Sequence, residues 1–142
     1  ALLARMARDQ IAVEINLTSN AVILGVKGSD HPLSLYREAG VPVVLSTDDE
    51  GVSRSDMTNE YLRAVTEQGL RYGDLKQIVR NGLHYSFLPG DSLWQNRPGG
   101  ARVAACLMID ASACSAFMAA NPKAAAQATL ERDLQAFEAM PR

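Results

Sequence analysis

The sequence predicts an α/β fold with parallel strands, of which this chain holds the last part, and three observations lead to that prediction. Two apolar runs, residues 11–15 and 41–45, lack strict polar alternation, as strands buried on both faces do. Residues 11–47 therefore predict strand, crossover helix and strand, the connection that makes two strands parallel. Two strands cannot bury their own faces, so we expect residues 11–88 to end a larger α/β fold, followed by a helical extension.

The elements around the first strand carry local start and stop signals. Residues 2–8 have an apolar helical face and predict a helix. Residues 16–20 end the first strand with polar side chains. His31-Pro32 opens a helix over residues 33–39, with Asp30 or His31 as its cap and the proline in its first turn. Gly40 then ends that helix, because glycine is a good residue after a helix C-terminus.

The pattern after the second strand is helical. One helix is capped by Ser55 or Asp56 and ends at Gly69. Its expected inner face is apolar and holds Met57, Tyr61, Leu62 and Val65. A second helix begins at Asp74. Its expected inner residues are Leu75, Ile78, Val79 and Leu83.

We expect the chain to divide into residues 1–90 and a helical C-terminal extension, residues 91–142, that packs on the first part. Residues 91–100 predict a loop, and the alanine-rich residues 101–118 predict one or two helices. Asn121-Pro122 is a strong start signal for a last helix that runs to about residue 139. Its expected inner edge is Leu130, Leu134 and Phe137.

The composition excludes several classes of protein. The 142 residues carry a net charge of −2, with 47% hydrophobic and 21% charged residues, which is ordinary for one globular domain. No basic stripe with interleaved aromatics predicts a nucleic-acid partner, and no apolar run approaches the roughly eighteen residues of a membrane span. The N-terminus has neither an initiator methionine nor the layout of a signal peptide, so we expect a piece of a longer protein.

The two cysteines, Cys106 and Cys114, show no metal-binding spacing. In one straight helix their Cα atoms would lie roughly 12 Å apart, whereas a disulfide needs less than about 7 Å. They can pair only if the chain turns between them, near residues 110–112. The favoured expectation is two small buried side chains without a disulfide.

The most informative residues follow the second strand, where Ser46 and Thr47 lead into the acids Asp48 and Asp49. The carboxyl ends of parallel strands are where α/β folds bind ligands. Two adjacent carboxylates there need a cation or a proton partner to compensate them. We therefore expect Asp48 to bind a metal and Asp49 to orient a substrate. The alternative is loop chemistry, with one acid capping the next helix.

Four motifs stand in register along the chain: Glu14-Ile-Asn-Leu-Thr-Ser-Asn20, His31-Pro-Leu33, residues 41–54 with their Ser-Thr-Asp-Asp strand end, and Asn81 with Tyr85-Ser-Phe-Leu88. Together they resemble the C-terminal part of the metal-dependent adenosine deaminases. The resemblance covers roughly residues 2–94, and the last helix is similar as well. Asp-Asp-Glu-Gly-Val-Ser-Arg with Phe-Leu-Pro-Gly is most similar to bacterial members near the growth-factor-like branch.

The resemblance implies a fold, a cofactor and roles for three residues. The fold is an eight-stranded (β/α) TIM barrel, with the two strands here as its seventh and eighth. The cofactor is one zinc ion, held by three histidines and an aspartate that matches Asp48. Asp49 matches the acid that holds the purine through a ring nitrogen, and Ser19 matches a serine that supports the metal aspartate. The implied reaction of purine metabolism is hydrolysis of adenosine to inosine and ammonia.

The remaining family residues lie upstream of this chain. His31 and His84 match no ligand position, and we expect them to cap or pack. Arg54 and Glu60 are expected at solvated positions. Because a catalytic zinc takes at least three protein ligands, Asp48 cannot hold one by itself. The parent protein is thus expected to be the enzyme and the fragment alone inactive. The alternatives are a truncated, non-catalytic barrel fragment or a related AMP or adenine deaminase.

Overall fold

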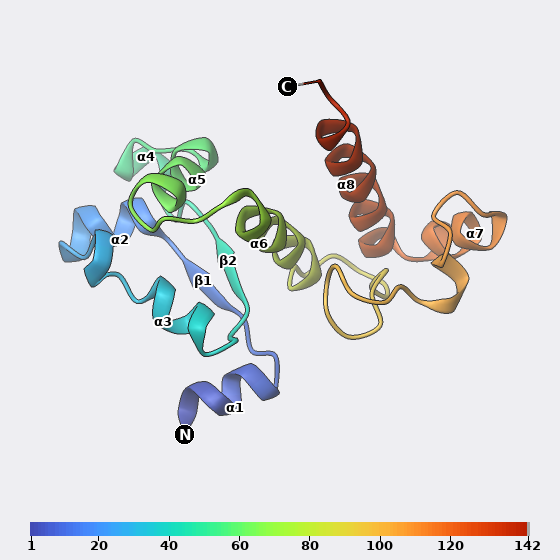
Figure 1. The fold of residues 1–142 in the computed structure, drawn as a ribbon, viewed down its shortest axis with the longest axis horizontal. Helices are drawn as coiled ribbons and strands as arrows, with labels where there is room; N and C mark the ends of the chain where they lie inside the picture. The colour runs from blue at the N-terminus through green and yellow to red at the C-terminus, as the bar shows by residue number, and fades with distance from the viewer. Residues whose placement is uncertain (142) are drawn as a thin grey trace. The chain divides into compact units, whose positions relative to one another are not determined.

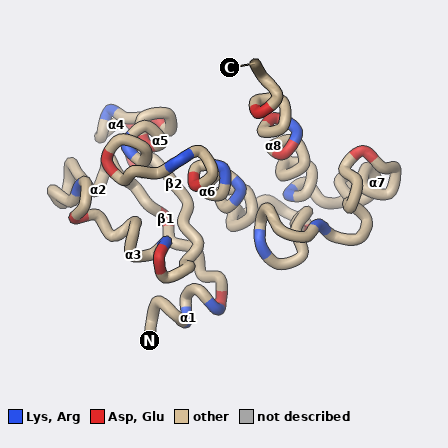
Figure 2. The backbone as a smooth tube through the Cα atoms, viewed as in Figure 1, with Lys and Arg blue, Asp and Glu red and all other residues tan. Residues whose placement is uncertain are grey.

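The computed structural model describes residues 1–141, which divide into two compact units, Ala1–Val79 and a second unit that begins at Arg80 (Figure 1). Charged residues of both signs are interspersed in each unit (Figure 2). Among the described residues, no helix combines the length and the apolar character that crossing a bilayer requires.

The first unit contains two parallel strands, β1 (Val13–Ile15) and β2 (Val43–Leu45), with Val13 opposite Val43 and Ile15 opposite Leu45. The chain between the strands forms α2 (Leu17–Leu24), a 3-10 turn at Gly28–Asp30, and α3 (Leu33–Glu38) (Figure 1). The predicted strand, crossover and parallel strand are therefore confirmed as a mixed α/β arrangement. The polar residues expected to end the first strand lie instead in the first turn of α2.

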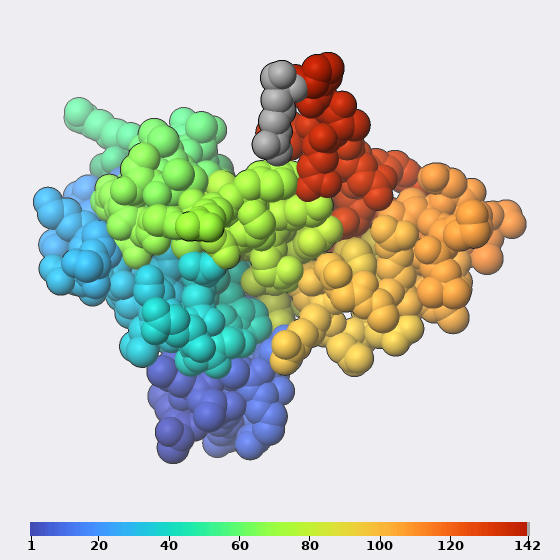
Figure 3. Space-filling model, in the orientation of Figure 1, coloured from blue at the N-terminus to red at the C-terminus, as the bar shows by residue number. Residues whose placement is uncertain are grey.

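The other helices of this unit are α1 (Leu2–Arg8), α4 (Glu50–Ser53), α5 (Met57–Thr66) and the start of α6 (Tyr72–His84). No residue of α1, drawn in dark blue in Figure 3, is buried. The core lies between the strands and the helices and consists of Ile15, Leu17, Leu33, Val43, Leu45, Ala64, Leu70 and Ile78.

The predicted inner face of α5 is confirmed for Tyr61, which packs against the core, and is wrong for Leu62 and Val65. Leu62 is 57% exposed and Val65 43%, while Glu60 and Ala64 are fully buried. The helix packs on α2 and β2 through the stripe that contains Glu60 and Ala64, which are one turn apart. The Glu60 carboxylate hydrogen-bonds to the backbone at the start of α2, and this polar contact helps to fix the rotation of the helix beside the apolar packing of Ala64 and Tyr61.

The second unit contains the end of α6, a 3-10 turn at Ala104–Cys106, α7 (Ser112–Ala120) and α8 (Pro122–Glu138). An isolated antiparallel bridge between Trp94 and Arg102 closes the loop after α6. Its core is built from Leu93, Trp94, Cys106, Ile109, Cys114, Ala124 and Ala128.

Two expectations about this unit are corrected. Cys106 and Cys114 form a disulfide, with Cα atoms 4.5 Å apart, because the chain turns at residues 109–110 between the 3-10 turn and α7. Phe137, expected on the inner edge of α8, is 57% exposed. The buried face of α8 carries Ala124, Gln127, Ala128 and Glu131 instead, since small residues allow close packing and Glu131 pairs with Arg80.

Candidate functional site at the carboxyl end of β2

The polar residues after β2 lie at the edge of the sheet where both parallel strands end. Thr47 is still buried, whereas Asp48 and Asp49 are exposed. The backbone of Asp48 has φ +55°, in the left-handed region that few residues other than glycine adopt and that aspartate tolerates better than most. This conformation turns the chain out of the strand and into α4, so the Asp48 side chain stands at the sheet edge.

Ser19 lies next to Asp48, although 29 residues separate them in the sequence. Ser19 sits in the first turn of α2, which follows β1 directly, and its Oγ donates a hydrogen bond to Asp48 Oδ2 at 2.8 Å. Ser19 is itself only 5% exposed, so its hydroxyl is held in place by packing. The parallel pairing of β1 and β2 thus brings together two residues that the sequence analysis singled out.

Asp49 stands at the N-cap position of α4, but its side chain makes no capping hydrogen bond. Its backbone carbonyl accepts hydrogen bonds from the Ser53 amide and the Ser53 hydroxyl, both at 2.9 Å. The acid that does cap a helix is Asp56, whose Oδ1 accepts from the Asn59 amide at 2.8 Å at the start of α5. The Asp49 carboxylate is therefore exposed and unused by the local backbone.

The residues present could supply one ligand of a metal ion but not a complete set of ligands. Residues 1–141 contain no group of three or more His, Cys, Asp or Glu side chains that could hold an ion. Asp48 alone offers a carboxylate whose Oδ2 is oriented by Ser19, which is the arrangement of a metal-ligating carboxylate with a supporting hydrogen bond. The other ligands of a zinc ion would have to come from outside these residues.

The ring nitrogens of His31 contact α2 and the start of α3 rather than either acid. His31 is buried, its Nδ1 accepts from the Leu33 amide at 3.2 Å, and its Nε2 lies 2.9 Å from Asn20 Oδ1. Burial lowers the pKa of His31 and repulsion from Arg63 lowers it further, against weaker attraction from nearby acids. The predicted capping and packing role of His31 is thus what its contacts provide.

Glu60 was missed by sequence reasoning, which expected a solvated position. The side chain is 0% exposed, and both carboxylate oxygens accept from the Thr18 amide at 3.2 Å. Ser55 Oγ donates a third hydrogen bond at 3.3 Å. Nothing in the local sequence of α5 distinguishes this acid from an exposed one, because its main partner, the Thr18 amide, lies 42 residues earlier in the chain.

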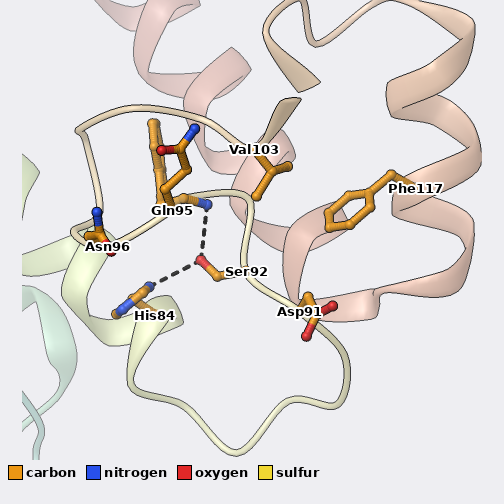
Figure 4. A pocket seen from close by; sticks show the side chains of 8 residues that line it. His84, Asp91, Ser92, Gln95, Asn96, Val103 and Phe117 are labelled. Atoms are coloured by element: carbon orange, nitrogen blue, oxygen red, sulfur yellow. Dashed lines mark hydrogen bonds between the residues drawn. The ribbon is translucent and has the colours of Figure 1, made fainter. Parts of the chain in front are cut away.

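A pocket with a volume of about 390 Å³ lies wholly within the second unit (Figure 4). It is lined by His84, Asp91, Ser92, Trp94, Gln95, Asn96, Val103 and Phe117. Ser92 Oγ lies 3.1 Å from His84 Nδ1 and accepts a hydrogen bond from the Trp94 amide at 3.1 Å. Burial and the charge of Lys123 lower the pKa of His84. These hydrogen bonds fasten the loop after α6 to its neighbours.

Comparison with known proteins gives a consistent result for the first two thirds of the chain. The family model described as adenosine deaminase matches residues 1–95. The aminodeoxyfutalosine deaminase of Streptomyces coelicolor is 36% identical over 104 residues, which cover 72% of this chain and 25% of that protein.

Two adenosine deaminases give matches of similar strength. Those of Shewanella loihica and Shewanella denitrificans are 38% and 36% identical over 88 residues, covering 61% of this chain and 27% of each relative. The chain therefore spans about a quarter of the length of these relatives.

Proposed function

Because this chain belongs to the adenosine deaminase family, we propose that the complete protein is a zinc-dependent hydrolase that deaminates a purine nucleoside. The reference reaction is the conversion of adenosine to inosine and ammonia. The single observation that carries the proposal for this chain is the hydrogen bond from Ser19 to Asp48 at the joint carboxyl end of two parallel strands. Such an edge is where α/β folds bind ligands.

In this proposal Asp48 is the carboxylate ligand of the metal and Asp49 orients the substrate. Zinc, when bound, supplies a water molecule whose pKa is lowered toward about 7. The oxygen of Asp48 that Ser19 does not engage would bind the metal, and the carboxylate would also accept a hydrogen bond from the attacking water. Ser19 keeps the carboxylate from rotating, and Asp49, whose carboxylate is exposed and makes no capping bond, holds a purine ring nitrogen.

The fold of the complete protein is part of the same proposal. We assign β1 and β2 to the seventh and eighth strands of a (β/α)8 barrel, with residues 1–90 as barrel and residues 91–142 as its extension. The support is the family match over residues 1–95 together with the parallel register of the strands. On this assignment the histidine ligands lie outside this chain, so the chain alone is inactive.

A specific observation favours a second candidate substrate. The match to a protein named aminodeoxyfutalosine deaminase is longer than the match to either adenosine deaminase, 104 against 88 residues. The proposed chemistry at the purine is the same for both substrates, so the choice between them lies in contacts with the rest of the molecule. An AMP or adenine deaminase and a non-catalytic barrel fragment are the further outcomes that the test distinguishes.

The test is an assay of the complete gene product, purified with zinc, against adenosine, aminodeoxyfutalosine, AMP and adenine. Loss of the 6-amino group is followed by the change in ultraviolet absorbance and by ammonia release. Asp48→Ala should abolish turnover, whereas Glu50→Gln, at an exposed acid two residues away, should keep it. If no 6-aminopurine is turned over by the zinc-loaded protein, the proposed function is wrong and the non-catalytic alternative holds.

A further inference from the structure

Glu60 is a buried acid that the proposed function leaves unused. Its side chain is 0% exposed, and within residues 1–141 it makes no ion pair, since the nearby Arg63 pairs with Glu67 at 3.0 Å. A buried carboxylate without a cation is costly unless hydrogen bonds compensate it. Here the compensation comes from the start of α2, where the Thr18 amide donates to both oxygens and the positive end of the helix dipole favours a negative charge.

The backbone amides at the start of α2 need the Glu60 carboxylate because the N-cap side chain of this helix makes no capping bond. Asn16 occupies the N-cap position but makes no side-chain capping bond. Its Nδ2 donates to the Ser46 carbonyl at 3.2 Å and to Glu14 Oε1 at 3.3 Å. An N-cap side chain would ordinarily accept from the amide two or three residues on. That amide, on Thr18, is held by Glu60 from α5 instead.

The Thr18 side chain is tied to α5 as well. Thr18 Oγ1 accepts from Asn59 Nδ2 at 3.1 Å and from Ser55 Oγ at 3.3 Å. The amide and the hydroxyl of one residue are thus both fixed by the N-terminal turn of α5. The next residue along the chain is Ser19, whose Oγ donates to Asp48 at 2.8 Å, so the anchored residue directly precedes the one that holds the Asp48 carboxylate.

We propose that Glu60 is a positioning residue that acts on Asp48 through the first turn of α2. Its carboxylate fixes the Thr18 amide, the fixed turn holds Ser19, and Ser19 aims the Asp48 carboxylate. The role of Asp48 as a metal ligand rests on the proposed function, whereas the anchoring of α2 by Glu60 does not. Outer residues that orient a metal ligand typically change metal affinity by about 10- to 100-fold when removed.

The experiment is a double-mutant cycle on the complete protein, with zinc affinity measured by competition against a chromophoric chelator. Glu60→Gln keeps the shape of the side chain but sets an NH2 group against the Thr18 amide, and should weaken zinc binding about tenfold. Ser19→Ala should do the same. Because Glu60 acts through Ser19, the double variant should bind zinc no more weakly than Ser19→Ala. Glu67→Gln, at the C-cap of α5, is the control and should leave zinc affinity unchanged.

A zinc-free readout separates this proposal from the proposed function. Amide hydrogen exchange of residues 17–20 in the metal-free protein should speed up about tenfold in Glu60→Gln and stay unchanged in Glu67→Gln. If the wild-type protein binds no zinc, the proposed function fails while the exchange result still tests the anchoring. Unchanged exchange in Glu60→Gln, or independent effects of Glu60 and Ser19 on zinc affinity, would overturn the positioning role.

A milder variant covers the case in which Glu60→Gln does not fold. Ser55→Ala removes one hydroxyl, which bridges Glu60 and Thr18, and should speed the same exchange by about threefold, as expected for one weak hydrogen bond. If amide exchange is unchanged in Ser55→Ala, that result would also count against the anchoring of α2 by Glu60.

Discussion

Reduction of the Cys106–Cys114 disulfide is predicted to destabilise the second unit. The bond closes a loop with a sequence separation of 8 residues, and both cysteines are 0% exposed in the core that also contains Trp94. Comparing oxidised with reduced wild-type protein isolates the cross-link, because no side chain is removed and no cavity is made. The sequence alone favoured two unpaired thiols, so this comparison also tests whether Cys106 and Cys114 are bonded.

The magnitude follows from the length of the closed loop. In the chain-entropy model, a loop of about nine residues raises the free energy of unfolding by about 2.5 kcal/mol. For a unit of this size, each kcal/mol changes the melting temperature by about 4–8 °C. Reduction should therefore lower the melting temperature of the second unit by about 10–20 °C.

The assay is a thermal melt followed by tryptophan fluorescence, since Trp94 is the sole tryptophan of the 142 residues and is 5% exposed in the affected core. Protein is compared with and without a reductant under which thiol titration finds two free cysteines. The melting temperature of a Cys106→Ala, Cys114→Ala double variant should be equal to or lower than that of the reduced protein, and the reductant should not change it. Melting temperatures within about 2 °C in the two states would show that the disulfide does not stabilise this unit.

Two further predictions concern single side chains. Because burial lowers the pKa of His31 below its ordinary 6.5, the unfolded state binds the proton more readily, and stability should fall as the pH drops below about 6.5. The urea midpoint should thus be lower at pH 5.5 than at pH 7.5, with a smaller difference in His31→Asn. Arg80 donates two hydrogen bonds of 2.7 Å to Glu131, which is 4% exposed, so Glu131→Ala should lower the free energy of unfolding in denaturant by about 3 kcal/mol. Arg132→Ala, which breaks an exposed pair with Asp110, should change it by less than about 0.5 kcal/mol.

The features that sequence reasoning predicted are those with local causes. Gly40 and Gly69 follow helix ends and have φ of +74° and +66°, a conformation that glycine adopts without strain. Asp56 caps α5 as its position before the helix indicates. The parallel pairing of β1 and β2 follows from a crossover of helical residues. Each of these predictions needed only residues a few positions apart, or the order of the helices and strands along the chain.

The features that sequence reasoning missed depend on partners that are distant in the chain. Glu60 reads as a solvated acid because its partner, the Thr18 amide, is 42 residues away. Leu62 and Val65 were assigned to the inner face of α5 on apolar character alone, but the hydrogen bonds of Glu60 help to set the rotation of that helix. The disulfide required the turn at residues 109–110, for which the alanine-rich composition gives no signal.

The distribution of charge around Asp48 bears on which purine compound the proposed enzyme accepts. Helix N-termini are ready binding sites for phosphate, yet the start of α2 beside Asp48 is already occupied by the Glu60 carboxylate. The chain that leaves β2 adds three consecutive exposed acids, Asp48, Asp49 and Glu50. A phosphate group near these residues would meet like charges, and the Thr18 amide at the start of α2 is already engaged by Glu60. For the part of the site that this chain supplies, we therefore propose a preference for a nucleoside over a nucleotide such as AMP.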